Sequence, residues 1–555
     1  MKHGSKKPKN NLKASLISLA VTLVFGALYY YVILPALNFQ SGDLYAFIII
    51  LCAVYAICKL CLTFGVVKKK GIEISVSSIK NLFKVATVPS VIAVVAITVA
   101  LIGSIFGAKL FRANDYASLL EISDGDFASE VVEIDWEQIP MLDSTSANNL
   151  ANRKLGELSD LVSQFVVSES SSQINYKGSP VRVTYLEYTN FFKWLSNQKE
   201  GIPAYMTIDM RSQEVTVVRL EEGIKYSPSE FFNRNLYRHL RFKYPTFIFD
   251  NINFEVDENG TPYWIASVVN KKIGLFGGTD VVGAVLVNAI TGECEYVDIA
   301  DTPAWVDRVY SADLIIEQYD YRGLYSNGFF NALFSQSGCT QSTEGYNYIV
   351  LGDDVWLYTG VTSVTSDEGN IGFILVNQRT KEAKYYSCAG AEEYSAMSSA
   401  EGAVQQYSYV STFPLLLNIS NQPTYFMALK DSAGLVKMYA MVNVRQYQLV
   451  ATGYTLEECN DNYLKLLVKN NLVDDEVEIP SDTLTVAGKI ADIRTADIDG
   501  NTFFYIRLEE GDGYYAVSAK DYPEVIILNV GDTVAEIEYA NTDSVIKEAV
   551  KLKIK

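Results

Sequence analysis

The sequence predicts an α-helical membrane anchor of three spans, followed by α+β repeats outside the membrane and a small C-terminal β-barrel. Three observations carry this prediction: long apolar runs confined to the start, a phrase that recurs at nearly constant spacing, and a final stretch of short alternating strands. With 555 residues, the chain is too long for one hydrophobic core, so several folded units are expected.

Charge divides the chain at the same place as hydropathy. Residues 1–112 carry 13 Lys and Arg against 2 Asp and Glu, whereas the remainder carries 33 against 63. Because the acidic bulk repels phosphate backbones, no nucleic-acid partner is expected.

Three apolar runs, at 16–37, 44–67 and 85–108, each meet the requirement of about 20 residues for a membrane span. A cleaved signal peptide does not explain the first run, since its apolar part is too long and two more spans follow. The chain is therefore expected to be integral to the membrane, with three spans.

Orientation follows from the distribution of lysine in the short flanks. The loop between the first two spans, around Asp43, has no Lys or Arg, whereas the N-terminus and the second loop are rich in Lys: Lys2, Lys6, Lys7, Lys9, Lys13, Lys68, Lys69, Lys70, Lys80 and Lys84. The N-terminus is predicted to be cytoplasmic, and residues 113–555 extracytoplasmic, at a plasma membrane.

Lys59 lies inside the second apolar run. One interpretation is an ion or proton relay with a buried partner, and the other is a side chain that reaches toward the inner face of the membrane. The apolar runs contain no acidic residue to pair with Lys59, which favours the second interpretation.

Cysteine is sparse outside the spans. Four thiols in 443 residues do not make a dense disulfide framework, and their pairing stays open: Cys294, Cys339, Cys388 and Cys459. Their spacing does not match a metal site, and no cofactor is expected.

A short phrase recurs after the anchor. It reads apolar strand, then [DN]-x-x-[ST]-x-E, then a second strand, at offsets of 79 and 89 residues. Its polar positions are Asp209, Ser212 and Glu214, then Asn288, Thr291 and Glu293, then Asn377, Thr380 and Glu382. A fainter fourth copy starts at Asn443, and a second phrase, at 311–319 and 399–407, repeats in nearly the same register. Such periodicity predicts duplicated α+β units.

The physical chemistry of the phrase favours a hairpin turn. An Asx side chain accepts a hydrogen bond from the backbone two residues on, and a residue with positive φ then rejoins the second strand. Gly292 suits that position, while Gln213 and Lys381 would adopt it at a cost of about 1 kcal/mol. The alternative is a ligand or cation bound at the polar face of the turn.

The stretch from Val287 to Glu293, V-N-A-I-T-G-E, resembles the closing strand signature of PepSY domains. Upstream, Ser227-Pro228-Ser229-Glu230 is predicted to be a capping box, and Phe232, Leu236 and Leu240 form an apolar stripe at helical spacing. Strands at 247–256 and 262–269 complete the PepSY-like order, with an inserted loop expected at 270–281. The resemblance covers 227–297 well and 340–390 weakly, and it implies a non-catalytic envelope module that is often linked to restraint or regulation of peptidases.

Two further segments complete the expected organisation. Residues 148–166 have a helical apolar face, and the helix is expected to be broken at 168–172. Near the C-terminus, five short strands suggest an OB-like barrel, at 484–492, 502–508, 514–518, 525–528 and 533–539. The expected domains are the membrane helices at 1–112, a helical stalk or linker at 113–180, a first partial repeat at 181–225, a PepSY-like unit at 226–322, a second at 323–410, a degenerate α+β unit at 411–475 and the barrel at 482–555.

Catalytic patterns are weak. His239 is the one histidine beyond the anchor and is flanked by basic residues, which disfavour its protonation. Ser196 and Lys199 match S-x-x-K without the companion motifs of that enzyme class. The stretch 497–501 resembles a calcium loop but has Leu508 where the twelfth-position Glu belongs.

No catalytic, cofactor or metal residue is therefore assigned. The sequence favours a non-enzymatic, membrane-anchored envelope protein whose repeats bind or regulate a protein partner, such as a peptidase or cell-wall enzyme. The alternatives are a structural or assembly factor that acts through its spans, and a cell-wall hydrolase.

Overall fold

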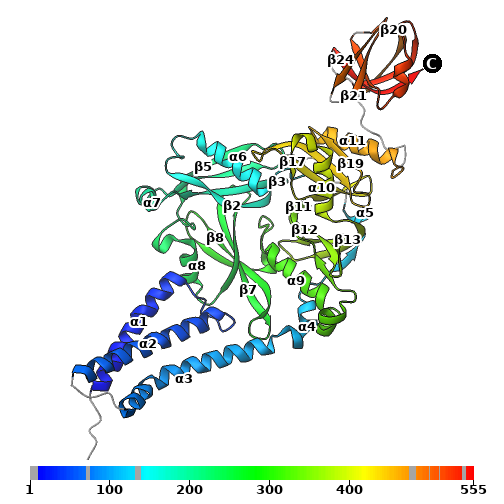
Figure 1. Cartoon of the computed structure of the whole chain (residues 1–555). Coiled ribbons are helices and arrows are strands. Elements are labelled where there is room, and N and C mark those ends of the chain that lie inside the picture. Colours follow the sequence, from blue (N-terminus) through cyan, green and yellow to red (C-terminus); the bar gives the residue numbers. More distant parts are fainter. Residues whose placement is uncertain are drawn as a thin grey trace, which may run out of the picture. The chain divides into compact units, whose positions relative to one another are not determined.

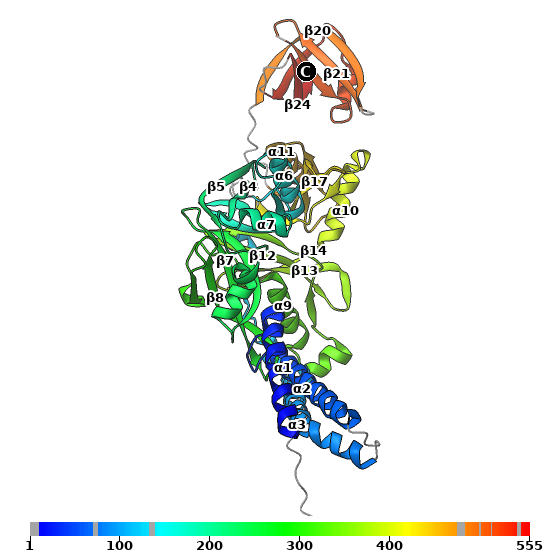
Figure 2. The ribbon, with the colours of Figure 1, turned by 90° about the vertical axis from the view of Figure 1, so that its left-hand side faces the viewer.

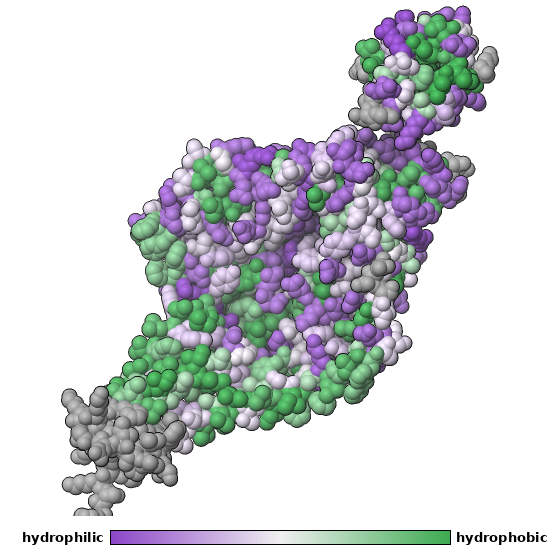
Figure 3. Space-filling model, in the orientation of Figure 1, coloured by the Kyte–Doolittle hydropathy of each residue, from purple (hydrophilic) through white to green (hydrophobic). Residues whose placement is uncertain are grey.

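Three helices, α1 (Asn10–Ile33), α2 (Gly42–Lys69) and α3 (Val76–Phe106), are long and apolar enough to cross a membrane. Helix α2 packs against both others, and Figures 1 and 2 show the three side by side. Their surface is predominantly apolar (Figure 3). Helix α1 ends earlier than the apolar run because Leu34 has a positive φ of 57° and precedes Pro35.

The computed structural model describes residues 10–69, 76–131, 139–473, 483–498, 501–511, 513–540 and 545–554. The chain divides into two units, Met1–Asn460 and Asp461–Lys555, and each is described by itself. The first unit contains the three long helices, a short connection and a β-rich region at 139–460. The connection comprises α4 (Lys109–Ala117), β1 (Ser123–Gly125) and α5 (Phe127–Glu130).

The β-rich region repeats one pattern four times, in which a helix precedes four antiparallel strands in sequential order. We call these repeats 1 to 4, at 139–224, 225–308, 309–391 and 391–460, where Ala391 ends the last strand of repeat 3 and also makes the closing contact of repeat 4. Repeat 1 comprises α6 (Ser144–Gly156), β2 (Phe165–Tyr176), β3 (Ser179–Tyr188), α7 (Phe191–Asn197), β4 (Ile202–Asp209) and β5 (Val215–Ile224). Repeat 2 comprises the 3₁₀ turn η2 (Phe232–Arg234), α8 (Leu236–Lys243), β6 (Ile248–Val256), β7 (Pro262–Ile273), β8 (Gly277–Asn288), β9 (Cys294–Asp298) and η3 (Ile299–Asp301).

Repeats 3 and 4 follow the same order, with an additional short strand before the first hairpin of each. Repeat 3 comprises α9 (Ala312–Tyr325), the π-helical turn η4 (Asn331–Ser335), β10 (Thr340–Ser342), β11 (Asn347–Leu351), β12 (Asp354–Ser363), β13 (Ser366–Asn377) and β14 (Ala383–Ala391). Repeat 4 comprises α10 (Glu393–Ala403), η5 (Gln405–Tyr407), β15 (Val410–Ser411), β16 (Leu415–Ile419), β17 (Gln422–Lys430), β18 (Val436–Asn443) and β19 (Val450–Gly453), after which α11 (Leu456–Lys469) begins.

The sheet of repeat 2 is buried on both faces. Along β7, Trp264 and Ala266 pack into a core shared with repeat 1, whereas Ile265 and Val269 pack into a second core shared with repeat 3. Successive side chains of a strand point to opposite faces, so a sheet between two cores requires a continuous apolar run. This requirement explains the mostly apolar stretches 263–269 of β7 and 281–287 of β8.

Three local expectations from the sequence are wrong. The helix expected at 148–166 ends at Gly156, and Ser168–Ser172 belongs to β2 rather than to a break, so the segment expected to be a stalk contains the first strand of repeat 1. The loop expected at 270–281 is instead the end of a long β7–β8 hairpin. Ser227 does not cap a helix, because α8 begins at Leu236 and its N-cap is Asn235, which accepts from Arg238 N.

Contacts at the ends of α1 and α3 are among those that join the β-rich region to the long helices. On α8, the guanidinium groups of Arg238 and Arg241 donate to Tyr31 O (3.1 Å) and Leu34 O (2.9 Å), at the C-terminal end of α1. There the carbonyls lack partners within the helix and favour positive charge. At the end of α3, Gly103 and Gly107 lie against the tip of the β7–β8 hairpin, where a Cβ on Gly103 would be 2.6 Å from the Leu275 side chain.

The second unit contains a closed barrel with the strand order β20-β21-β22-β24-β23. The strands are β20 (Thr483–Ile498), β21 (Asn501–Leu508), β22 (Tyr514–Ser518), β23 (Thr533–Ala540) and β24 (Ile546–Ile554). The segment expected to be a strand at 525–528 is instead part of the 3₁₀ helix η6 (Pro523–Ile527), which begins at a proline. Its place in the barrel is taken by β24, which the sequence reasoning missed.

Candidate functional site

The recurring phrase forms the same turn in repeats 1, 2 and 3, between the third and fourth strands. Each Asx side-chain oxygen accepts two backbone N–H groups, two and three residues on. The pairs are Asp209 with Arg211 (2.9 Å) and Ser212 (2.7 Å), Asn288 with Ile290 and Thr291 (3.0 Å each), and Asn377 with Arg379 (2.8 Å) and Thr380 (2.9 Å). The fifth residue has the left-handed conformation that the sequence predicts, with φ of 62° at Gln213, 75° at Gly292 and 67° at Lys381.

The remaining motif residues also act within the turn. Each hydroxyl oxygen accepts the N–H of the following Glu, in the pairs Ser212 with Glu214 (3.3 Å), Thr291 with Glu293 (3.2 Å) and Thr380 with Glu382 (3.3 Å). The three Glu side chains are exposed and come from three different repeats. This arrangement is that of a hairpin and does not bring the motif carboxylates together.

The residue after each Asx closes its repeat on itself. Its carbonyl accepts from the segment that leads into the helix of the same repeat: Met210 O from Met141 N (3.0 Å), Ala289 O from Lys225 N and Tyr226 N (3.0 Å each), Gln378 O from Val309 N (3.1 Å) and Tyr310 N (2.8 Å), and Val444 O from Ala391 N (2.9 Å). Its N–H donates to the start of the second strand, at Pro180, Pro262, Val355 and Pro423. The fourth copy, at Asn443, thus makes the same closure.

The sequence carried a signal for this closure that reasoning on the phrase alone missed. In three of the four repeats, the acceptor at the start of the second strand is a proline. Proline offers a carbonyl without an N–H and is tolerated at a strand start. A proline at that place would have located the second strand of each repeat.

The catalytic patterns considered from the sequence are not assembled as catalytic groups. Ser196 Oγ donates to Phe192 O (3.0 Å), and Lys199 is exposed. His239 Nε2 lies 2.7 Å from Gly292 O and 3.4 Å from Cys294 Sγ. Since a carbonyl only accepts, Nε2 carries the proton and is not free to take one from the thiol. Burial lowers the pKa of His239 and raises that of Cys294, which disfavours an ion pair between them.

The other candidates are equally local. At the stretch that resembles a calcium loop, Thr502 Oγ1 donates to Asp497 Oδ1 (2.6 Å) across a β20–β21 hairpin, whose central residues 499 and 500 lie outside the described residues. Over the ranges that the structure describes, no group of three or more His, Cys, Asp or Glu is placed to hold a metal ion. The seven cysteines, all described, are free thiols. Lys59 Nζ lies 5.3 Å from the centre of the Tyr55 ring in α2.

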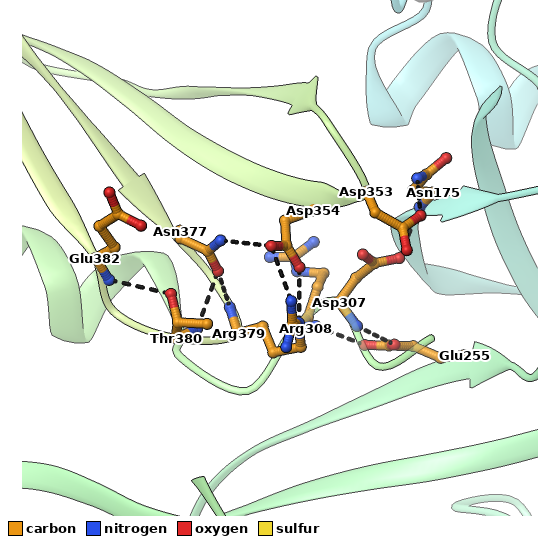
Figure 4. Close-up of polar contacts among 10 residues, drawn as sticks. All are labelled: Asn175, Glu255, Asp307, Arg308, Asp353, Asp354, Asn377, Arg379, Thr380 and Glu382. Atoms are coloured by element: carbon orange, nitrogen blue, oxygen red, sulfur yellow. Dashed lines mark hydrogen bonds and ion pairs between the residues drawn. The ribbon is translucent and has the colours of Figure 1, made fainter. Parts of the chain in front are cut away.

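A buried polar cluster joins repeats 1, 2 and 3 (Figure 4). Glu255, on β6, accepts the backbone N–H groups of Asp307 (2.9 Å) and Arg308 (3.0 Å), and Asp307 Oδ2 accepts Asn175 N from β2 (2.6 Å). Burial raises the pKa of Glu255 to about 7 and, together with the Glu255 charge, raises that of Asp307. The other oxygen of Asp307 is buried without a hydrogen-bond partner.

The third copy of the turn extends this cluster. Arg379 forms a two-pronged ion pair with Asp354 (2.7 and 2.9 Å), and Asn377 Nδ2 donates to the same carboxylate (2.8 Å). Asp353 accepts Asn175 Nδ2 (2.9 Å) from repeat 1. The contacts of this turn with Asp354 lie within repeat 3, whereas Lys381 of the same turn pairs with Asp280 of repeat 2 (2.6 Å).

Next to this cluster lies a cavity of about 590 Å³, which we call the arginine pocket. Figure 3 shows a polar hollow on this face of the β-rich region. The cavity is lined by side chains from all four repeats, including Arg182 of β3, Arg308 after η3, and the rings of Tyr185, Tyr237, Trp264, Tyr346, Tyr348 and Phe413. Arg182 is 7% exposed and Arg308 9% exposed. Sequence reasoning did not find this pocket, because its residues come from segments with no shared spacing.

A second feature is an exposed aromatic surface on repeats 1 and 2. We call it the aromatic patch, and it consists of Phe191, Phe192, Leu195, Phe231 and Phe232. Phe192 is 74% exposed and Phe232 57% exposed, and the rings of Phe191 and Phe231 lie 5.1 Å apart.

Buried, hydrogen-bonded side chains support the aromatic patch from below. Buried Glu230 accepts from Trp194 Nε1 (2.7 Å) and from Tyr188 Oη (2.9 Å), and Trp194 lies beneath the patch, with its ring 5.6 Å from that of Phe232. Burial raises the pKa of Glu230. Phe232 has a φ of 53°, which is unfavourable for a bulky residue and persists only where its surroundings impose it.

Comparisons with known proteins give no family. No protein-family model matches the chain, and no curated protein matches it. A crystal structure of a variant ACO/RPE65 chimera, in a monoclinic crystal form, is similar to this chain at 8% sequence identity, over 69% of this chain and 64% of that chain, with a TM-score of 0.14. A score this low carries no argument about fold or function.

Proposed function

We propose that this chain is a non-catalytic, membrane-anchored envelope protein whose extracytoplasmic repeats bind a protein partner. The observation that carries the proposal is the aromatic patch. Exposed apolar clusters of this kind mark interaction sites, and aromatic rings are enriched in protein interfaces. The patch is held by a buried carboxylate and a strained backbone, which a surface without a partner does not require.

The four repeats are proposed to be PepSY-like. Support comes from the V-N-A-I-T-G-E stretch at the turn of repeat 2 and from the helix-then-strands order that all four repeats share. A PepSY-like identity favours a peptidase or a cell-wall enzyme as the partner. For the barrel we propose an OB-like class, because its first three strands are followed in space by the fifth and then the fourth.

The partner can be tested by photocrosslinking in intact cells of the native host. A photoreactive residue at position 192 of the full chain is expected to give one discrete protein adduct, identified by mass spectrometry. Tyr447, which is 49% exposed and lies in repeat 4, is the matched control position. Phe232→Ser should reduce the adduct at 192 several-fold, because it removes a ring from the patch.

The same experiment separates the alternatives. If position 192 gives no adduct, or the same adducts as position 447, the patch is not a docking site. An assembly factor that acts through its spans would then be favoured if the three helices alone restored the function of a deletion strain.

A further inference from the structure

The arginine pocket brings two guanidinium groups together, and the nearby carboxylates, Asp143 and Glu255, make no hydrogen bond or ion pair with either of them. Arg182 makes one long contact, from Nη1 to Ser171 Oγ (3.4 Å), and its Nε has no hydrogen-bond partner. The guanidinium of Arg308 stacks 4.3 Å from the centre of the Tyr348 ring and donates to the hydroxyl of that residue, while its Nε also lacks a partner. Among the described residues, no ion pair to a carboxylate involves either arginine.

The acidic groups at the rim are engaged elsewhere or exposed. Asp143 accepts Lys430 Nζ (2.6 Å) and Ser146 N (2.9 Å), and Glu169 is exposed. Glu255 uses both oxygens on backbone N–H groups beside the pocket. Burial and the neighbouring charge of Arg308 lower the pKa of Arg182 to about 10. A buried guanidinium that is not hydrogen-bonded to a counter-ion is costly, and the pocket contains two of them, so an anion bound between them would be favoured.

The other residues that line the cavity indicate which kind of molecule would carry the anionic group. Aromatic rings line part of the cavity, and Ser170, Ser171 and Ser172 add small polar groups. A volume of about 590 Å³ is within the range of small-molecule sites, which combine apolar walls with a few placed polar groups. Guanidinium groups bind carboxylate and phosphate with paired N–H donors.

We propose that the arginine pocket binds a small anionic ligand, whose carboxylate or phosphate lies between Arg182 and Arg308 and whose body packs against the aromatic walls. This site is separate from the aromatic patch, so the ligand does not depend on the protein partner proposed above.

The test uses the full chain in detergent micelles at constant ionic strength. Phenyl phosphate and benzoate are the probes, and benzamide is the neutral counterpart of benzoate. Both anions are expected to raise the apparent Tm and to give saturable heat in calorimetric titration, whereas benzamide gives neither. The probe that binds with the higher affinity shows whether the acid group of the natural ligand is a phosphate or a carboxylate.

Variants separate binding from folding. Arg182→Gln should weaken the tighter probe by about 10- to 100-fold, which is the usual effect of losing a hydrogen bond to a charged group. Without ligand, the same variant should have an unchanged or higher Tm, because it removes an uncompensated charge. Arg182→Lys keeps the charge and should retain partial binding. Arg219→Gln, at an exposed arginine that pairs with Asp160, is the matched control and should leave binding unchanged.

Any one of four results would overturn the proposal. Benzamide could bind as well as benzoate, Arg182→Gln could bind as well as the unchanged chain, or neither anion could bind at concentrations up to about 10 mM, where even weak specific sites fill. If Arg182→Gln instead lowered the Tm without ligand and Arg182→Lys restored it, the arginine would have a structural role and the anion site would be rejected.

Discussion

At the scale of single residues, the junction of repeats 1, 2 and 3 depends on carboxyl groups removed from water. Glu255 and Asp307 are both buried, and Glu255 accepts the backbone N–H groups of Asp307 and Arg308. Their raised pKa values mean that the folded chain binds more protons than the unfolded chain near neutral pH. Stability therefore falls as pH rises from the ordinary range of a carboxyl, near 4.5, to about 7.

Asp307→Asn tests this dependence. The amide oxygen can still accept from Asn175 N, and the amide nitrogen takes the place of an oxygen that has no partner. We expect the free energy of unfolding at pH 8 to rise by about 1 kcal/mol and the loss of stability between pH 5 and pH 8 to shrink. Thermal unfolding across this pH range measures both, with Asp301→Asn, at an exposed site, as the control. An unchanged pH slope in Asp307→Asn would contradict the interpretation.

At the scale of elements, the hairpin turn shows how the sequence encodes each repeat. The positive φ at its fifth residue suits glycine, and only repeat 2 has glycine there. In repeat 2 the position is also crowded, because a Cβ on Gly292 would lie 2.3 Å from the Tyr226 ring. Repeats 1 and 3 tolerate Gln213 and Lys381, whose side chains reach Tyr439 Oη (3.3 Å) and Asp280 (2.6 Å).

Substitution at the fifth residue should therefore have opposite effects in different repeats. Gly292→Ala is expected to lower the free energy of unfolding by about 2 kcal/mol, because it adds both backbone strain and a clash with Tyr226. Gln213→Gly should change it by between zero and a gain of about 1 kcal/mol, since relief of strain is offset by a lost hydrogen bond. Scanning calorimetry of the two variants measures the difference. Equal destabilisation by both would show that the turn conformation does not control stability.

Much of this element-level design could be predicted from the sequence, and particular residues show why the rest could not. The Asx turn and its left-handed fifth residue depend on neighbours within six positions, so the phrase at Asn288 predicts them. The start of α8 could not be predicted, because Glu230 bonds with Trp194 and Tyr188 of repeat 1 instead of capping a helix. The arginine pocket likewise joins Arg182 and Arg308, which are 126 positions apart in the chain.

At the scale of the whole molecule, the lysine-rich flanks are the evidence for the proposed orientation. The structure shows three helices able to span a membrane and a β-rich region that contacts the ends of α1 and α3. These ends are the ones without lysine-rich flanks, so the contacts agree with an extracytoplasmic β-rich region.

Cysteine labelling in intact cells tests the orientation. Glu258→Cys, at an exposed turn of repeat 2, should react with a maleimide that does not cross membranes. Lys69→Cys, at the end of α2, should react only after the membrane is opened. Background from Cys339, Cys388 and Cys459 is expected to be low because they are buried, and the unsubstituted chain measures the labelling of half-buried Cys294. Labelling of Lys69→Cys and protection of Glu258→Cys in intact cells would reverse the proposed topology.

The closure of each repeat on itself has a consequence for how such a chain changes in length. Because the carbonyl after the Asx residue accepts from the segment that enters the same repeat, both partners of this closing contact belong to one repeat. A gene duplication with its boundaries near positions 225, 309 or 391 would insert a repeat that already contains both partners of its closing contact. Only the packing between repeats would then have to change.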